Sequence, residues 1–554
     1  MKKWSLLVAL GIVLSVFLAA CGGDDNSTEG SKSKDSGTSE SSGDNTLNLL
    51  QSGTISTMDS SMATDEFSFQ FLGSTMEGLY RLDKNGEPTE GIAKEHKVSD
   101  DGLTWTFTLR EDAKWENGDP VTANDFVYAW QRAVNPETGS EYGPYMMSGV
   151  IKNAEAVSSG DAAVDELGVT AKDDYTLVVE LENPTPYFES LTTFGTFLPL
   201  NEKFVEEQGD KYATSSETVL SNGPFVLKNW TSTSSSWDLE KNESYWDADT
   251  VQLDKLTYEV VKDPQTAVDL YEKGTVDRAD LSSDLVDQYA THEDYNVSPE
   301  MSVWYLKFNE TRNEALANTN IRAALSRAFD KQSLVDVILN NGSVVANGLI
   351  PENFVQMPEG EKDFREVSGD HITYDPEAAK EYWKKGLKEL GKDSIELEFL
   401  SGDTETAKTM NEYLVNQLES NLDGLKINLK QVPGEQRLDL DTKMDYDIQL
   451  SGWGPDYLDP YTYMSLWVTD GGNNKMGYSN KEYDKLVEET TTELATNNTA
   501  RYENFLEAEK ILFEDAAIAP VYQRAKAQLV SPKMHGVYMN AFGPTYEYKW
   551  ASVE

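Results

Sequence analysis

The chain has 554 residues, of which 96 are Asp or Glu and 47 are Lys or Arg, so its formal net charge at pH 7 is −49. A surface with this excess of carboxylates repels a phosphate backbone, which excludes nucleic acid as the partner. The length allows two or three domains of ordinary size. Because Cys21 is the one cysteine in the sequence, an internal disulfide and a cysteine-based metal cluster are excluded, and stability must come from hydrophobic cores.

The first 20 residues have the pattern of an export signal, in which two lysines precede an apolar run over residues 6–17. The sequence LAAC follows and ends at Cys21. It resembles the lipobox of bacterial lipoproteins, and this resemblance implies that a lipid is attached to Cys21. A short membrane helix followed by a free thiol is the alternative, but the apolar run is too short to span a bilayer comfortably. We therefore expect a signal peptide over residues 1–20 and membrane anchoring through the lipid on Cys21.

Residues 22–45 consist of Gly, Ser, Thr, Asp, Glu, Lys and Asn and contain no apolar side chain that could be buried. A segment of this composition is predicted to be disordered. A flexible coil of about 24 residues reaches roughly 25 to 30 Å, which is enough to hold a folded body away from a membrane. Residues 21–45 are thus predicted to be the lipidated cysteine and a disordered tether.

The folded part begins with a predicted strand at residues 47–50, followed by a loop over residues 53–59. Residues 104–109 alternate polar and apolar side chains, which predicts another strand. Thr122 and Asp125 then have the spacing of a capping box at the start of a helix. This helix has an apolar stripe that we expect in the core: Phe126, Ala129, Trp130 and Ala133.

Aromatic residues without helical or strand periodicity follow at 142–146, beside a glycine and a proline, and are predicted to line a pocket or to join the core. Further on, Asp375 before a proline and Gly391 give one predicted helix clear boundaries. Strands that alternate with helices in this half of the chain indicate a mixed α/β lobe. The predicted strands lie at residues 176–182, 304–309, 425–432 and 446–450, and the predicted helices at 376–390 and 406–422.

The stretch GWGPDYLDP, at residues 452–460, directly follows the strand predicted at 446–450. In open α/β sheets, ligands bind just beyond the carboxyl ends of strands. Trp453 would provide a flat aromatic wall with glycine backbone beside it, and Asp456 would place a carboxylate at the mouth of the site. The alternative is that Asp456 only caps the turn and that Trp453 belongs to the core.

This stretch resembles the GW-x-x-DY-x-DP signature of the oligopeptide-binding lipoproteins of ABC importers, which form family 5 of the extracellular solute-binding proteins. The resemblance extends over almost everything after residue 45. It implies an α/β fold of the periplasmic-binding-protein type II, in which two lobes close like a hinged clamp and the first lobe carries an extra subdomain. Further positions that match the family are Trp115, Gly118, Asp119, Pro120, Ala123, Asp125 and Phe126.

The resemblance also implies how the chain is divided. The strand at 304–309 and the segment 519–522 are expected to be two crossings between the lobes. Lobe 1 is expected to comprise residues 46–65, 220–305 and 521–554, the extra subdomain residues 66–219, and lobe 2 residues 306–520.

The family further implies the role of the motif. Asp456 matches the aspartate that pairs with the free α-ammonium group of a ligand peptide. The backbone of Gly452, Trp453 and Gly454 matches the strand that pairs with the peptide main chain. Charge supports the first assignment, because an α-amino group with a pKa of about 8 is mostly cationic at neutral pH, and a partly desolvated carboxylate binds such a cation.

A second backbone contact is expected from the opposite side of the ligand. The resemblance makes Thr54, Ile55 and Ser56 the candidates for it. Lys307 and Arg437 are basic candidates for a contact with the ligand's C-terminus.

Recognisable catalytic and metal-binding patterns are absent from the sequence. We find no Walker-type phosphate loop, no GxSxG elbow and no Cys-His pair, so any energy for transport must come from another protein. The chain is predicted not to be an enzyme and to need no cofactor and no metal. The four histidines lie far apart and form no HxxxH or HExxH pair: His96, His292, His371 and His535.

Together these features predict a monomeric, lipid-anchored receptor on the outer face of the bacterial cytoplasmic membrane. As the resemblance implies, it would capture extended oligopeptides and deliver them to the permease subunits of an ABC importer with their cytoplasmic ATPases. Three alternatives stay open. The chain could bind another solute, such as a sugar, a nickel chelate or haem; it could be the receptor for a peptide pheromone; or it could be an extracellular hydrolase with a Trp-rich acidic cleft.

Overall fold

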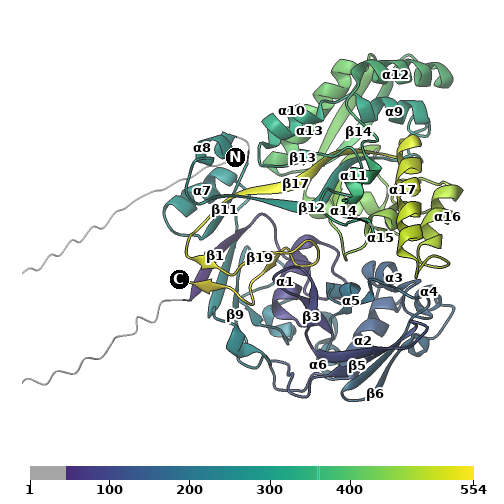
Figure 1. The fold of residues 1–554 in the computed structure, drawn as a ribbon. Helices are drawn as coiled ribbons and strands as arrows, with labels where there is room; N and C mark the ends of the chain where they lie inside the picture. The colour runs from purple at the N-terminus through teal and green to yellow at the C-terminus, as the bar shows by residue number, and fades with distance from the viewer. Residues whose placement is uncertain (1–44, 283, 359, 361) are drawn as a thin grey trace, which may run out of the picture. The chain divides into compact units, whose positions relative to one another are not determined.

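The computed structural model of the protein describes residues 45–282, 284–358, 360 and 362–554. The predicted signal peptide, Cys21 and all but the last residue of the predicted tether lie outside the described residues. The described part combines helices with several β-sheets, which confirms the predicted α/β class (Figure 1). No helix in it is both long and apolar enough to cross a membrane.

A four-stranded sheet places the first strand of the folded part beside strands that follow much later in the chain. In the order of the sheet, the strands are β1 (Thr46–Gln51), β10 (Lys255–Val260), β9 (Ser236–Lys241) and β8 (Phe225–Lys228). β1 is parallel to β10, and the other neighbours are antiparallel. Leu47 and Leu49 of β1 alternate with more exposed residues and are buried in the core. The chain between β1 and β8 is therefore an insertion into this sheet.

The insertion contains a second four-stranded sheet, which is antiparallel throughout. Its strands, in order, are β4 (Ala93–Val98), β5 (Thr104–Leu109), β7 (Thr176–Glu180) and β6 (Val169–Asp173). Helix α2 (Ala123–Val134) begins with the predicted cap, in which the Thr122 N–H donates to the Asp125 carboxylate over 2.6 Å. Phe126 and Trp130 of its apolar stripe are fully buried, which confirms their predicted place in the core.

One large hydrophobic core joins the first sheet, the insertion and the C-terminal segment, and it includes Leu49, Phe107, Trp237 and Tyr548. Helices of this part are α1 (Glu66–Thr75), α3 (Tyr142–Met147), α4 (Ala154–Ser158), α5 (Phe188–Leu191) and α6 (Glu202–Gln208). Helices α7 (Pro264–Glu272) and α8 (Asp284–Tyr289) belong to a separate small core, which includes residues 279, 281, 527 and 529. Short strands are β2 (Tyr80–Leu82), β3 (Pro88–Glu90), β18 (Met534–His535), β19 (Tyr538–Met539), β20 (Tyr546–Glu547) and β21 (Ser552–Val553).

A seven-stranded mixed sheet organises the rest of the described chain, with the order β11-β17-β12-β16-β14-β15 and with β13 also paired to β17. The long strands β12 and β17 are antiparallel neighbours and run from the region of α7 and α8 toward that of α9 and α12 (Figure 1). They contain the two segments predicted as crossings. The strands are β11 (Arg278–Leu281), β12 (Tyr295–Phe308), β13 (Val344–Val345), β14 (Ile395–Gly402), β15 (Leu425–Val432), β16 (Ile448–Trp453) and β17 (Ile518–Val530).

Both faces of this sheet are covered by apolar cores. Alternate residues of β12 enter two of them, with Leu306 and Phe308 in one and Val303 and Tyr305 in the other. The arrangement is the mixed α/β lobe that the sequence predicts. Its helices are α9 (Thr319–Arg327), α10 (Lys331–Ser333), α11 (Phe364–Ser368), α12 (Pro376–Leu390), α13 (Glu405–Asn421), α14 (Gly434–Thr442), α15 (Tyr461–Met464), α16 (Lys481–Glu489) and α17 (Asn498–Glu514).

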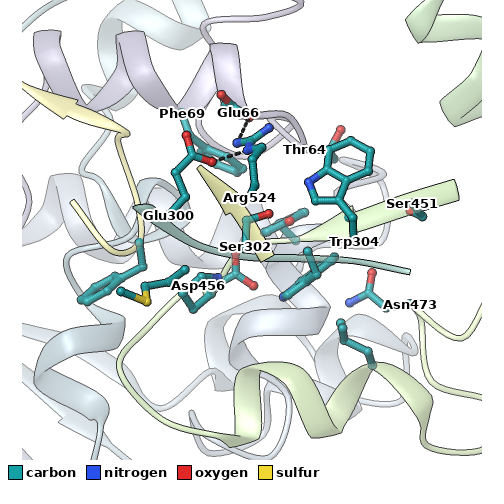
Figure 2. A pocket seen from close by; sticks show the side chains of 18 of the residues that line it. Thr64, Glu66, Phe69, Glu300, Ser302, Trp304, Ser451, Asp456, Asn473 and Arg524 are labelled. Carbon is teal, nitrogen blue, oxygen red and sulfur yellow. Dashed lines mark hydrogen bonds and ion pairs between the residues drawn. The ribbon is translucent and has the colours of Figure 1, made fainter. Parts of the chain in front are cut away.

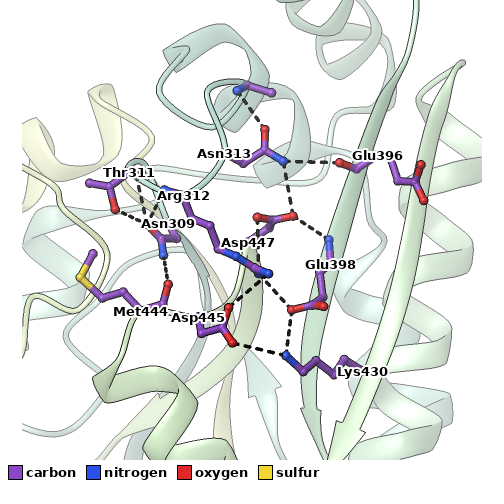
Figure 3. Close-up of polar contacts among 11 residues, drawn as sticks. Asn309, Thr311, Arg312, Asn313, Glu396, Glu398, Lys430, Met444, Asp445 and Asp447 are labelled. Atoms are coloured by element: carbon purple, nitrogen blue, oxygen red, sulfur yellow. Dashed lines mark hydrogen bonds and ion pairs between the residues drawn. The ribbon is translucent and has the colours of Figure 1, made fainter.

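Ion pairs fix the residues that lead into β16 (Figure 3). Arg312, in the loop after β12, lies 3.0 Å from the Glu398 carboxylate of β14 and 3.6 Å from that of Asp447. The buried Asp447 carboxylate also accepts a hydrogen bond from the Glu398 N–H over 2.8 Å. Lys430 of β15 adds a 3.2 Å pair with Glu398. The start of β16 is therefore tied to its neighbours on both sides.

Candidate functional site

A cavity of about 340 Å³ lies beside the carboxyl end of β16 (Figure 2). Ligand-binding clefts in proteins typically enclose about 300 to 1,000 Å³, so this space is large enough for a small ligand. The wall is formed by residues of α1, β12, β16 and α14 and by the segment 540–545. It includes four of the residues predicted from the sequence: Gly452, Trp453, Gly454 and Asp456.

Strand β16 has an open edge at this cavity. It runs to Trp453, beyond the predicted end at residue 450, because β12 pairs with it along its whole length, from Ile448 to Trp453. On the other side, β14 pairs only with Ile448 and Gln449. Among the described residues no strand lies on that side of positions 450–453, so their backbone is available to an added strand.

Gly452 allows an aromatic ring to stand close to this edge. A Cβ atom at position 452 would lie 2.5 Å from Cε2 of Trp304, closer than any real side-chain carbon comes. Gly454 differs, because the atom nearest to an added Cβ would be the Ser302 Cβ at 4.0 Å. The indole of Trp304 therefore occupies the space that a side chain at position 452 would need, and the glycine keeps the backbone accessible.

Four nitrogen atoms in the cavity wall have no hydrogen-bond partner among the described residues. They are the indole Nε1 atoms of Trp304, Trp453 and Trp467 and the Nδ2 atom of Asn473. All four groups are donors. Each of these atoms is almost completely buried, so none of them is open to a ligand in this form of the cavity.

Asp456, in the middle of the motif, is 5% exposed, and among the described residues its carboxylate forms no ion pair. The Tyr145 hydroxyl donates a hydrogen bond to Asp456 Oδ2 over 3.1 Å. Burial raises the pKa of Asp456 to about 7, and this hydrogen bond opposes the shift. A buried carboxylate without a counter-ion is destabilising, so the site is complementary to a cationic group of a ligand.

The turn after β16 is closed by groups other than the Asp456 carboxylate. The Asp456 N–H donates to Thr462 Oγ1 over 3.0 Å. Asp459, the second aspartate of the motif, accepts a hydrogen bond from the Tyr461 N–H and two 3.0 Å bonds from the Arg501 guanidinium. In the described chain the structural role at this turn therefore belongs to Asp459, and the turn-cap alternative for Asp456 is not supported.

The segment predicted as the second ligand contact is not part of the cavity wall, which includes none of Thr54, Ile55 and Ser56. Ile55 is fully buried in the first core, whereas Thr54 and Ser56 are exposed to solvent. The contact role of these three residues therefore stays a prediction.

The cavity wall also includes residues at the start of α1, namely Thr64, Glu66 and Phe69. The sequence analysis missed this segment. One local signal was present, since Asp65 is an N-cap whose carboxylate accepts a hydrogen bond from the Ser68 N–H over 3.0 Å. Such a cap marks where a helix begins but not which cavity it faces.

Aromatic residues of the insertion lie close to the motif. Tyr142 lines the cavity, and Tyr145 binds Asp456. Tyr145 is not part of the cavity wall, and the rings of both tyrosines also pack against the first core, so residues 142–146 combine the two predicted roles.

The loop after Asp456 is docked on the insertion. The rings of Tyr187 and Tyr457 stack with their centroids 4.6 Å apart and their planes 7° apart. The Leu458 N–H also donates to Ser190 Oγ over 3.1 Å. The two sides of the cavity are thus held together by side-chain and backbone contacts next to the motif.

A cluster elsewhere has the residue types of a catalytic triad but not the geometry. His371 Nε2 lies 2.9 Å from Ser368 Oγ and 3.1 Å from Glu509 Oε2. Both partners meet the same ring nitrogen, so the carboxylate cannot orient the ring through the other nitrogen as a triad requires. The buried Glu509 binds Arg365 through both oxygens, at 2.7 Å each, as in a structural network. In the described part of the chain, no group of His, Cys, Asp and Glu could hold a metal ion.

Comparison with known proteins shows relatives of the chain and of its fold. A model of the bacterial extracellular solute-binding proteins, family 5 Middle, matches residues 87–475. A dipeptide-binding protein of Lactococcus lactis subsp. cremoris is 36% identical over 515 residues, which cover 90% of this chain and 93% of that protein.

Two solved structures resemble the chain closely. Listeria monocytogenes OppA bound to peptide is 46% identical, with a TM-score of 0.87 and coverage of 92% of this chain and 99% of that one. The pheromone receptor PrgZ has the same TM-score, 36% identity and coverage of 92% and 100%. These likenesses bear out the predicted two-lobed α/β fold of type II. The chain therefore belongs to family 5 of the bacterial extracellular solute-binding proteins.

Proposed function

We propose that this protein is the substrate-binding component of an ABC peptide importer, which captures an extended oligopeptide between two lobes and delivers it to the membrane permease. The observation that carries the proposal is the open edge of β16, which leads to a buried carboxylate without a cation. An extended peptide satisfies both features, because its backbone pairs with a strand edge and its α-ammonium group pairs with Asp456. In support, relatives of this chain are named for binding dipeptides and oligopeptides.

In this proposal the main chain of the peptide supplies most of the recognition. The backbone of Gly452, Trp453 and Gly454 pairs with it as a strand. Backbone recognition explains why a binding site can accept many side-chain sequences. Thr64 and Glu66 are now the stronger candidates for a contact from the opposite side. The contact role of the segment 54–56 remains a prediction from the family resemblance, without support from its position.

The proposal includes the place of the protein in the cell. The family is extracellular by description, and the LAAC sequence supports lipidation of Cys21 and anchoring to the outer face of the cytoplasmic membrane. The proposal also includes the predicted division into two lobes and an extra subdomain, and a monomeric state. Its partners are ABC permease subunits with their ATPases. No catalytic step is assigned to the chain.

A peptide-pheromone receptor is the second candidate, and the likeness to PrgZ favours it. A nutrient receptor and a pheromone receptor would use the same backbone contacts and differ only in how selective the side-chain pockets are. Native mass spectrometry of the protein starting at residue 22 would separate them. A mixture of adduct masses indicates a nutrient receptor, and one adduct mass indicates a pheromone. A sugar, nickel chelate or haem adduct would favour the remaining solute alternatives.

The direct test of peptide binding is isothermal titration calorimetry with a tetrapeptide of alternating alanine and serine. We expect binding that N-acetylation of the peptide weakens strongly, since acetylation removes the cation that Asp456 needs. Absence of binding by a random pool of short peptides would contradict the proposal.

A further inference from the structure

A hairpin near the C-terminus supplies one part of the cavity wall. It consists of the two short antiparallel strands β19 and β20 and of the loop over residues 540–545 between them. Most of this loop lines the cavity, through Asn540, Ala541, Phe542, Gly543 and Thr545. The function proposed above assigns no role to these residues.

The base of the hairpin is fixed to helix α1. The side-chain amide of Gln70 donates to the Tyr546 carbonyl oxygen over 2.9 Å and accepts from the Tyr546 N–H over 2.8 Å. Pro544 lies against Gly73, where an added Cβ would come within 2.1 Å of the proline ring. The Asn540 side chain donates to the Pro544 carbonyl oxygen over 2.7 Å. These contacts hold the two ends of the loop in place.

The tip of the same loop has no such contacts. Among the described residues, Ala541, Phe542 and Gly543 form no hydrogen bond and no ion pair. Gly543 has a φ of +70°, and a Cβ added to it would meet no atom within 4 Å, so the tip borders open space. A second cavity, of about 20 Å³, also reaches the loop at Asn540 and Pro544. The tip therefore has room to move while its base stays fixed.

Phe542 is buried without being part of a core. Its side chain is only 4% exposed, yet in the described chain it belongs to none of the hydrophobic cores. Met539, in the strand of the same hairpin, does pack against the first core. A core residue is held by many apolar neighbours, whereas Phe542 is held by the cavity wall and its own loop.

The cavity has to widen for a ligand with large side chains. Its volume of about 340 Å³ lies near the lower limit of the range for ligand sites, about 300 to 1,000 Å³. Parts of a protein that move on binding are those with few stabilising contacts. Elsewhere the wall is built largely from helices and strands with their own backbone hydrogen bonds, so the tip of the loop is the part best able to yield.

We propose that residues 541–543 form a movable flap of the cavity and that Phe542 is a specificity-determining residue for the peptide. This inference rests on the proposed peptide-binding function. The ring of Phe542 packs on a peptide with small side chains and fills the space that they leave. A bulky side chain of the peptide takes the place of the ring and pushes the flap outward. The fixed base returns the flap when the ligand leaves.

Calorimetry with three tetrapeptides tests this inference. They are Ala-Ser-Ala-Ser, Phe-Ser-Phe-Ser and Ser-Phe-Ser-Phe, because neighbouring side chains of an extended peptide point to opposite sides and only one set meets the flap. Each peptide is titrated into the wild type, Phe542→Ala and Met539→Ala. Met539 is the matched control, since it lies in the same hairpin, packs against the first core and is not part of the cavity wall.

Phe542→Ala should weaken the binding of the alanine-serine peptide by roughly 5- to 30-fold, the usual result of truncating an aromatic contact. It should bind the phenylalanine peptide that meets the flap at least as tightly as the wild type does, because no ring has to be displaced. Met539→Ala should change the affinity for all three peptides by a similar factor. The empty Phe542→Ala protein should melt close to the wild type, because the ring is not part of a core.

Hydrogen exchange in the wild type gives an independent measurement. In the empty protein the amides of residues 541–543 should exchange faster than that of Tyr546, which is bonded to Gln70. The alanine-serine peptide should slow the exchange of the flap, because the ring then packs on the ligand.

Any of three results would overturn the inference. They are an equal effect of Phe542→Ala on all three peptides, failure of the wild type to bind either phenylalanine peptide, and exchange of the flap that is slow in the empty protein or unchanged by the peptide. The exchange experiment needs no variant, so it decides the matter even if Phe542→Ala does not fold. A wild type that binds none of the three peptides would instead refute the proposed function itself, so the two failures are distinguishable.

Discussion

Two aspartates of the motif GWGPDYLDP have opposite roles, and their surroundings explain why. Asp459 and Arg501 are both buried and form a bidentate ion pair, so the charge of Asp459 is compensated within the protein. Asp456 is buried to the same degree but faces only the Tyr145 hydroxyl and the cavity. The empty protein therefore carries an uncompensated site that a ligand cation can stabilise.

The stability of the empty protein should depend on the protonation of Asp456. Its pKa of about 7 in the native state lies well above the ordinary value of about 4. Between about pH 4 and pH 7 the native state holds a proton that the unfolded state has released, so the free energy of unfolding falls as the pH rises. Asp456→Asn should therefore unfold at a higher temperature than the wild type at pH 8 and at a similar temperature at pH 4.

Differential scanning calorimetry at both pH values checks this prediction. The matched control is Asp459→Asn, which strands the buried Arg501 charge and should lower stability by about 3 to 5 kcal/mol at pH 8. If the Asp456→Asn protein melted below the wild type at pH 8, the carboxylate would be a structural group.

The ion pair between Asp456 and the peptide amine can be measured with a double-mutant cycle. Asp456→Asn should cost about 2 to 5 kcal/mol of binding free energy, or roughly 30-fold to several thousand-fold in affinity, because it leaves the ammonium group unpaired. N-acetylation of the peptide should cost the wild type a comparable amount and the variant little more. Calorimetry on the four combinations decides the matter, and additive losses would show that the two groups do not meet.

At the scale of elements, the first residues of β16 pair with strands on both sides, and its last residues pair with a strand on one side only. Its first residues pair with both β12 and β14, next to the ion pairs around Asp447. Its last residues pair with β12 alone and line the cavity. An edge that pairs on one side and is enclosed by a cavity on the other can add a ligand strand without exposing the sheet to other protein chains.

Glycine at position 452 is expected to be necessary for this edge. Gly452→Ala places a carbon atom against the rigid Trp304 ring, and such overpacking typically costs about 1 to 3 kcal/mol. We expect weaker peptide binding, because the ring or the strand must shift at the place where the ligand pairs. Gly454→Ala is the matched control, since its added carbon would stay 4.0 Å from the nearest atom, the Ser302 Cβ. Calorimetry that showed equal losses in both variants would count against a special role for position 452.

At the scale of the whole described body, the cavity lies where the insertion meets the loop that follows β16. The stacked pair Tyr187 and Tyr457 belongs to the first hydrophobic core, although Tyr457 comes directly after Asp456 in the chain. The Asp456 carboxylate likewise accepts a hydrogen bond from Tyr145 of the insertion. The contacts that hold the insertion to the motif thus lie next to the candidate site, and under the proposed function they would couple ligand binding to lobe closure.

Loss of the tyrosine stack should favour an open form. Tyr187→Ala removes an aromatic pair worth about 0.5 to 1.5 kcal/mol beyond its buried area, so the empty variant should show a larger radius of gyration in small-angle X-ray scattering. A saturating peptide should restore the wild-type value, since ligand contacts then hold the lobes. Tyr382→Ala, on the exposed side of α12, is the control. Identical scattering of the empty wild type and Tyr187→Ala would argue against this role for the stack.

The sequence by itself determined the elements whose signals are local. Helix α12 spans Pro376–Leu390, as predicted, because its Asp375 cap accepts a hydrogen bond from the Ala378 N–H and Gly391 takes the left-handed conformation that ends a helix. The strict alternation at 104–109 likewise fixed β5. Asp456 could be named as a candidate because the motif is contiguous, so one short stretch carries both the strand end and the carboxylate.

The tertiary structure alone decided which residues meet across the cavity. Tyr145 reaches Asp456 from a position 311 residues away, and Thr64 and Glu66 line the same cavity as the motif, whereas the sequence suggested an earlier segment. Of the two basic candidates, Lys307 is neutralised by Asp441 and only Arg437 is left without a carboxylate. Hydrogen bonds and ion pairs between such residues depend on how distant elements pack. The periodicity and composition of one stretch do not predict which side chain from another element will lie within hydrogen-bond distance.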